Sequence, residues 1–174
     1  MKKIVVCGLL LWGAWLSIAA EGNLVKNPDF AKTYAQGTKA ENWSLNSKKD
    51  TGVFTPTQEG GVLKLNANNK HTALLQEIPL KPYTGTMDLE MSFSYKGTIK
   101  RINGSLHATD ATGKELKIKC RSCQAVPAAD FQKISSRFQI PEGAVKLRVA
   151  LRAYGEGTVT FTDVQLSPAT ADKK

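Results

Sequence analysis

Three basic side chains lie two or four residues apart in one segment of the chain. Lys146, Arg148 and Arg152 alternate with apolar residues over positions 145–152. Successive side chains of a strand point to opposite faces, so these three form one stripe. The fork of an arginine binds carboxylate or sulfate groups bidentately. The stripe is therefore a candidate ligand-binding surface, and the alternative is a solvated strand face that discourages edge aggregation.

Two further lysines could extend this candidate surface. Lys117 and Lys119 share one face of another short apolar segment. If that strand lies beside the strand of Arg148, the stripe becomes a patch that pairs with carboxylates or sulfates.

Aromatic rings are the second group that can bind a ligand, because they combine a large contact area with a defined geometry. Trp43 is the only Trp after residue 20. Tyr34 lies in a polar stretch and Tyr154 precedes a glycine, so we expect both to be exposed in loops. Tyr34, Trp43 and Tyr154 are the candidate rings; for Trp43 the favoured alternative is an anchor in the core or at the sandwich edge.

Cys120 and Cys123 form the one Cys-x-x-Cys pair of the chain. In an exported protein a disulfide between them is the default expectation. A zinc site needs about four ligands, and no second such pair or nearby His is present. A redox motif of the thioredoxin type needs a strand and a following helix, which the sequence after Cys123 does not favour. Free thiols are the remaining alternative.

Catalytic motifs are absent from the sequence. There is no nucleophile elbow, no run of metal ligands and no Gly-rich phosphate loop. Asp88 and Glu90 alternate with apolar residues and indicate an exposed strand face rather than a pair of glycosidase carboxylates. We therefore expect a protein that is not an enzyme.

The first 19 residues have the features of an export signal. Lys2 and Lys3 precede an uncharged apolar run, and Ser17 and Ala19 form a small-x-small cleavage site. The run is short for a membrane span, so we expect removal of residues 1–19 and a periplasmic, cell-surface or extracellular location. The formal net charge of +9 suits anionic partners. No more than two basic residues are consecutive, and nucleic acid is not an expected partner.

Short segments of alternating apolar and polar residues fill the rest of the chain. The clearest are 87–95 and 145–152, and weaker ones are 23–25, 62–66, 72–78, 105–108, 115–119, 133–140 and 158–166. Such strands at 8–12-residue spacing predict an antiparallel β-sandwich. We expect one domain over residues 20–166 and a disordered tail over 167–174, which has nothing to bury.

Several of these segments also resemble a known family. The chain has Asn-Leu-Val-Lys-Asn-Pro-Asp-Phe at 23–30, Trp43 before a polar stretch, Gln-Glu-Ile-Pro at 76–79 and Phe-Thr-Asp-Val at 161–164. In order and spacing they resemble the cellulase-type carbohydrate-binding modules of families four, nine and twenty-two. The resemblance implies a jelly-roll sandwich of the galactose-binding type and a glycan ligand.

The resemblance also implies a structural calcium ion, although this chain departs from the family at residues that commonly help to hold it. Many members of the family carry a Glu after the first-motif Phe and two adjacent Asp residues in the last strand. This chain has Ala31, Thr162 and Asp163 at those positions. A calcium site on Asp163, with Asp29 and backbone carbonyls, is one alternative. The other is a polar residue at a strand end that bonds to nearby backbone.

Together these observations predict an exported, non-catalytic module that binds a poly- or oligosaccharide, with acidic glycans as one option. The alternative is an envelope protein that uses the same scaffold to hold another protein. A glycan-active hydrolase accessory is a third and less favoured interpretation.

Overall fold

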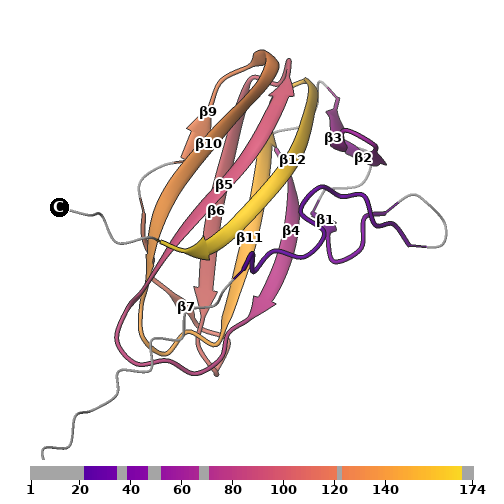
Figure 1. The fold of residues 1–174 in the computed structure, drawn as a ribbon. Coiled ribbons are helices and arrows are strands. Elements are labelled where there is room, and N and C mark those ends of the chain that lie inside the picture. Colours follow the sequence, from indigo (N-terminus) through magenta and orange to yellow (C-terminus); the bar gives the residue numbers. More distant parts are fainter. Residues whose placement is uncertain (1–21, 35–38, 47–51, 67–70, 121–122, 170–174) are drawn as a thin grey trace, which may run out of the picture.

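Two antiparallel sheets pack face to face in the computed structural model, which describes residues 22–34, 39–46, 52–66, 71–120 and 123–169 (Figure 1). No helix occurs in these ranges. The first sheet has the order β1 (Ser44–Asn46), β4 (Thr72–Pro79), β11 (Lys146–Tyr154), β6 (Arg101–Thr109) and β7 (Glu115–Leu116), and β9 (Cys123–Ala125) also pairs with β6. The second has the order β2 (Gly52–Thr57), β3 (Gly60–Leu65), β12 (Gly157–Pro168), β5 (Met87–Gly97), β10 (Ala128–Ile140) and β8 (Lys119–Cys120).

The alternating sequence explains the core between the sheets. The apolar side chains of β5 and β11 point inward and are buried, and their polar neighbours point outward. Four fully buried phenylalanines fill the largest part of this core: Phe30, Phe93, Phe138 and Phe161. The predicted sandwich is confirmed.

The last two strands occupy interior positions of the sheets. β11 lies between β4 and β6 in the first sheet, and β12 lies between β3 and β5 in the second. β11 and β12 are adjacent in sequence but lie in different sheets, as in Greek-key connections.

The segment before β1 is held by side chains rather than by a regular strand. The side-chain oxygen of Asn23 accepts a hydrogen bond from the Leu166 N–H, and its side-chain nitrogen donates to the Val164 carbonyl. Both bonds are 2.8 Å long. The N–H of Leu24 donates to the carbonyl of Leu166 at 2.8 Å. These bonds fasten residues 23 and 24 to β12, although the predicted strand over 23–25 is not formed.

Most strand predictions agree with the structure, and the differences are local. β1, β2 and β9 were not predicted, and the segment 115–119 divides into β7 and β8 in different sheets. The predicted tail begins too early, because β12 continues to Pro168 beside Leu89 of β5. The predicted signal, residues 1–19, lies outside the described residues.

Candidate functional site

The outer face of the first sheet carries the basic stripe. Strand β11 buries alternate residues and directs Lys146, Arg148 and Arg152 outward. In the register of the sheet, Arg148 lies between Glu77 of β4 and His107 of β6. The residues beside the stripe therefore come from β4 and β6, about 70 and 40 positions earlier in the chain.

Glu77 joins two members of the stripe. The Lys146 Nζ lies 3.2 Å from Glu77 Oε2, and the Arg148 Nη2 donates to Glu77 Oε1 at 3.1 Å. Hydrogen bonds from Lys146 and Arg148 hold the pKa of the Glu77 carboxyl below its ordinary value. One carboxylate thus partly neutralises two cations at this end of the stripe.

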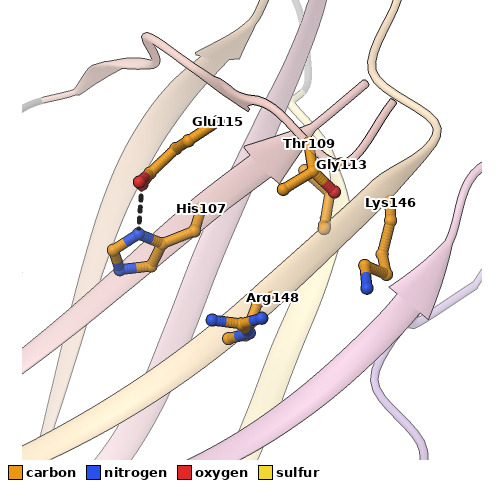
Figure 2. Close-up of a pocket in the computed structure, with 7 residues that line it drawn as sticks. His107, Thr109, Gly113, Glu115, Lys146 and Arg148 are labelled. Carbon is orange, nitrogen blue, oxygen red and sulfur yellow. Dashed lines mark hydrogen bonds and ion pairs between the residues drawn. The ribbon is translucent and has the colours of Figure 1, made fainter. Parts of the chain in front are cut away.

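A hollow of about 200 Å³ lies between β11, β6 and the turn after β6. Figure 2 shows His107, Glu115, Arg148 and Lys146 around it, with the His107–Glu115 contact as a dashed line. The other lining residues are Thr109, Gly113 and Leu147. Polar and charged groups dominate this hollow, so it suits a polar ligand group better than an apolar one.

His107 lies between the carboxylate of Glu115 and the guanidinium of Arg152 and contacts both. Its Nδ1 lies 2.7 Å from Glu115 Oε1, and its Nε2 lies 2.9 Å from Arg152 Nη2. Arginine only donates hydrogen bonds, so Nε2 accepts and Nδ1 carries the proton toward Glu115. The His107 hydrogen bond lowers the pKa of the Glu115 carboxyl. Arg152 also donates through Nη1 to the hydroxyl of Ser105, so its guanidinium is held along the sheet.

The other end of the stripe carries Tyr154. The guanidinium carbon of Arg101 lies 4.2 Å from the centre of the Tyr154 ring, and His71 is the second neighbour, at 5.6 Å between ring centres. Tyr154 therefore lies on the same sheet face as the stripe. One face of its ring is already covered by a cation.

Tyr34 and Trp43 lie together at a second hollow, at the β1–β4 end of the first sheet. This hollow is open and has a volume of about 410 Å³. The two rings differ in role. Tyr34 is 54% exposed, whereas Trp43 is 6% exposed, packs 4.9 Å from Phe30 and donates from Nε1 to the carbonyl of Asn27. The anchor interpretation of Trp43 fits this geometry, although Trp43 also lines the hollow.

The structure does not place Lys117 and Lys119 beside the stripe. β11 pairs with β4 and β6, whereas Lys119 lies in β8 at the edge of the second sheet. The hypothesis of a patch that combines these lysines with Arg148 is wrong. Period-two alternation shows which face a residue occupies but not which strands are neighbours.

The two cysteines are free thiols in the structure. Cys120 is exposed on β8 in the second sheet, and Cys123 is buried on β9 in the first sheet. Burial raises the pKa of the Cys123 thiol. The disulfide that the sequence predicts is not formed in this structure, and its formation in the exported protein stays a prediction.

The surroundings of Asp163 do not fit calcium. Its carboxylate accepts from the Gln165 amide at 2.7 Å and lies 3.4 Å from the Lys133 ammonium. Calcium prefers several oxygen ligands with carboxylates among them, and the described residues contain no cluster of three or more acidic, His or Cys side chains. Asp163 lies in a bulge within β12, with a φ of 51°, and its carboxylate contacts these two side chains, so it is not the backbone-bonded residue at a strand end that the alternative describes.

Sequence reasoning missed four residues of this face: Glu77, Arg101, His107 and Glu115. His107 alternates with apolar residues in its own strand, which predicts an outward side chain, whereas Glu77 follows the polar Gln76 and shows no such alternation. Nothing in the sequence indicates that these strands flank β11, because strand order depends on contacts between distant segments.

Comparison with known proteins identifies the class of fold. No family model matches the chain. No curated protein matches it either. A solved CBM4 module is similar over 83% of this chain and 99% of its own, with 20% identity and a TM-score of 0.59. TmCBM61, solved with β-1,4-galactotriose, is similar over 84% of this chain and 99% of its own, with 15% identity and a TM-score of 0.53.

A domain of a longer protein has the same fold. The enzymatically active domain of bacteriophage CBA120 tailspike protein 4 is similar over 84% of this chain, with 17% identity and a TM-score of 0.65. This chain spans only 21% of that tailspike chain. The fold is thus the jelly-roll β-sandwich of carbohydrate-binding modules, as the sequence resemblance implied. In the described part of the chain, no helix has the length and apolar character needed to cross a membrane.

Proposed function

We propose that this chain is an exported, non-catalytic module that binds a poly- or oligosaccharide. The fold supports this proposal, because the similar structures include CBM4 and a CBM61 module with a bound galactose oligosaccharide. A fold alone does not name a ligand. The proposal therefore depends on the surface that this chain offers.

The observation that carries the proposal is the outer face of the first sheet. Arg148, His107 and Glu115 surround a polar hollow, and Ser105, Arg152 and Tyr154 continue the same face. Sugar hydroxyls need closely spaced donors and acceptors, which these side chains supply. Interlocking hydrogen bonds hold several of them in place before a ligand arrives, and such preorganisation favours binding.

The carboxylates of this face support a non-catalytic role. Glycoside hydrolysis needs one carboxylic acid with a raised pKa as proton donor. Hydrogen bonds lower the pKa of both Glu77 and Glu115 instead, so both are ionised near neutral pH. Such carboxylates are suited to accept hydrogen bonds from sugar hydroxyls rather than to protonate a glycosidic oxygen.

A glycan array with the purified protein tests this function. We expect binding to at least one glycan class, and a loss of about tenfold for Arg148→Ala, which removes a charge-assisted donor. Lys64→Ala is the matched control, because Lys64 is exposed on β3 of the second sheet. Silence across neutral and acidic glycans contradicts the proposal and favours the rival interpretation, a scaffold that holds another protein.

A further inference from the structure

Two arginines on the outer face of the first sheet make no ion pair with a carboxylate in the described part of the chain. Among the described residues, the face has four cationic side chains, Lys146, Arg148, Arg152 and Arg101, and two carboxylates, Glu77 and Glu115. Glu77 pairs with Lys146 and Arg148, and Glu115 bonds to His107. Positive charge thus remains along the whole face, and Arg101 and Arg152 are the two of these cations that make no ion pair with a described carboxylate, although Glu115 attracts Arg152 over a longer distance.

The register of the sheet places these two arginines close together. Arg101 lies opposite Tyr154, and Arg152 lies opposite Asn103, so the two cations are diagonal neighbours on one face. The backbone positions of diagonal pairs in an antiparallel sheet are about 7–8 Å apart. The Arg152 guanidinium bonds to Ser105 and His107, and both cations attract an anionic group to this end of the face.

Both guanidinium groups are held by the protein and still have free donors. Arg101 lies over the Tyr154 ring, and this contact leaves the N–H groups in the guanidinium plane unused. Arg152 uses one N–H for Ser105 and one for His107, out of five. Orientation by neighbouring side chains lowers the entropy that binding costs. The role of Tyr154 is then to position Arg101 rather than to stack on a sugar.

Amide side chains lie beside this pair. Asn103 is opposite Arg152, and Gln124 of β9 is opposite Asn103, with both side chains on the outer face. Amides donate to and accept from hydroxyl groups. The surface thus combines donors for an oxyanion with partners for neutral sugar hydroxyls.

We infer that Arg101 and Arg152 form an anion subsite, and that the glycan bound by this face carries carboxylate or sulfate groups. This inference rests on the proposed glycan-binding function and adds the chemical class of the ligand. It also relocates the basic site that the sequence predicts, since Lys146 and Arg148 already share Glu77, while Arg101 and Arg152 pair with no carboxylate among the residues that the structure describes.

Titration calorimetry with protein expressed from the full-length sequence tests this inference with three sugars of similar size. These are a galacturonic acid trimer, a sulfated galactose trimer and a neutral galactose trimer. We expect one acidic trimer to bind at least about tenfold more tightly than the neutral trimer, as two charge-assisted contacts provide. The preferred acidic trimer then distinguishes carboxylate from sulfate. This preference falls as salt rises from 50 to 300 mM.

Variants assign the preference to the two arginines. Arg101→Gln and Arg152→Gln should each lower acidic-trimer affinity about tenfold, and Arg101→Gln should leave neutral-trimer affinity within about twofold. Lys64→Gln removes the same charge from the second sheet and should change neither. Arg101 is exposed, so its replacement leaves the fold intact, as circular dichroism should confirm.

Each outcome separates the two proposals. Equal affinity for neutral and acidic trimers overturns the anion subsite and keeps glycan binding. No binding of any trimer, together with silence on the array, overturns both. An equal loss for Lys64→Gln and Arg152→Gln, or similar affinity for a single-stranded DNA oligomer, shows non-specific attraction to polyanions and also overturns the subsite.

Discussion

Asn27 joins separate parts of the segment that precedes β1. Its side-chain nitrogen Nδ2 donates to the backbone carbonyls of Lys32 and Glu41 at 2.8 and 3.0 Å. Its side-chain oxygen Oδ1 accepts from the Lys32 N–H at 2.9 Å. Its backbone has a φ of 51°, which Asn tolerates better than most residues. The Asn27-Pro28 pair of the segment 23–30 is thus a folding element that also holds Trp43 through the backbone carbonyl of Asn27.

We expect Asn27→Ala to lower the free energy of unfolding by about 2–4 kcal/mol. The change removes three hydrogen bonds at a buried site and leaves their backbone partners without them. Urea unfolding followed by Trp43 fluorescence measures the effect. Lys26→Ala, next to it and exposed, is the control. A loss no larger than that of the control contradicts the role assigned to Asn27.

The two thiols should react differently in the reduced protein. Cys120 is exposed, whereas Cys123 is buried and has a raised pKa, so its reactive thiolate fraction is smaller at any given pH. We expect a thiol reagent at pH 8 to label Cys120 first and Cys123 only after unfolding. Peptide mass mapping reads the order. The same labelling before reduction tests the predicted disulfide, which blocks both thiols if it forms.

At the scale of elements, Glu77 connects β4 to β11. Its pKa is lowered chiefly by the hydrogen bond from Lys146, so its contribution to stability is full above the unfolded pKa near 4.5. The contribution is lost as the pH falls through the lower folded pKa. The carboxylate is about half exposed, at 51%, so we expect less than about 1 kcal/mol.

Glu77→Gln should therefore destabilise the protein slightly at pH 7, and the difference from the wild type should shrink below pH 4.5. Urea unfolding at pH 7 and pH 3.5 measures this difference. Glu142→Gln is a suitable control, because Glu142 makes no ion pair with a described residue. A difference that persists unchanged at pH 3.5 contradicts an electrostatic role for Glu77.

Gly104 allows β6 to approach the second sheet closely. A Cβ at this position lies 2.5 Å from Phe93 and 2.6 Å from Met91, which is far inside normal contact. We expect Gly104→Ala to lower the free energy of unfolding by about 1–3 kcal/mol, because overpacked cores must shift. Thermal unfolding checks this. Asn103→Ala, on the outer face of the same strand, should lower the free energy of unfolding clearly less.

The sequence predicts local features of these elements better than their arrangement. Alternation identified the long strands β5, β10, β11 and β12, since one face of each is buried. It missed β2, in which Pro56 argues against a strand, and the short β1 and β9. The outward direction of Arg148 was likewise predicted from its immediate neighbours in the sequence. Its pairing with Glu77 depends on strand order, which short-range patterns do not contain.

At the scale of the whole molecule, β12 connects parts of the chain that are distant in sequence. It pairs with β3 and β5, and its residues Val164 and Leu166 form hydrogen bonds with Asn23 and Leu24. Without it, the second sheet divides between β3 and β5, and Phe161 leaves the core. The strand is thus required by most of the fold.

We expect deletion of residues 157–174 to abolish cooperative unfolding, because the divided sheet exposes its apolar inner face to water. Deletion of residues 170–174 keeps every one of these pairings and should unfold as the wild type does. Circular dichroism during a thermal scan compares the two. A cooperative transition in the longer deletion contradicts the central role of β12.

The interior positions of β11 and β12 have a consequence for synthesis of the chain. The ribosome makes β11 and β12 after the other described strands, and neither sheet is continuous until they are available. The apolar faces of the earlier strands stay unpaired until these two strands have been made. A nascent chain of this design stays unfolded until β12 has emerged and depends on chaperones or rapid completion of these strands to avoid aggregation.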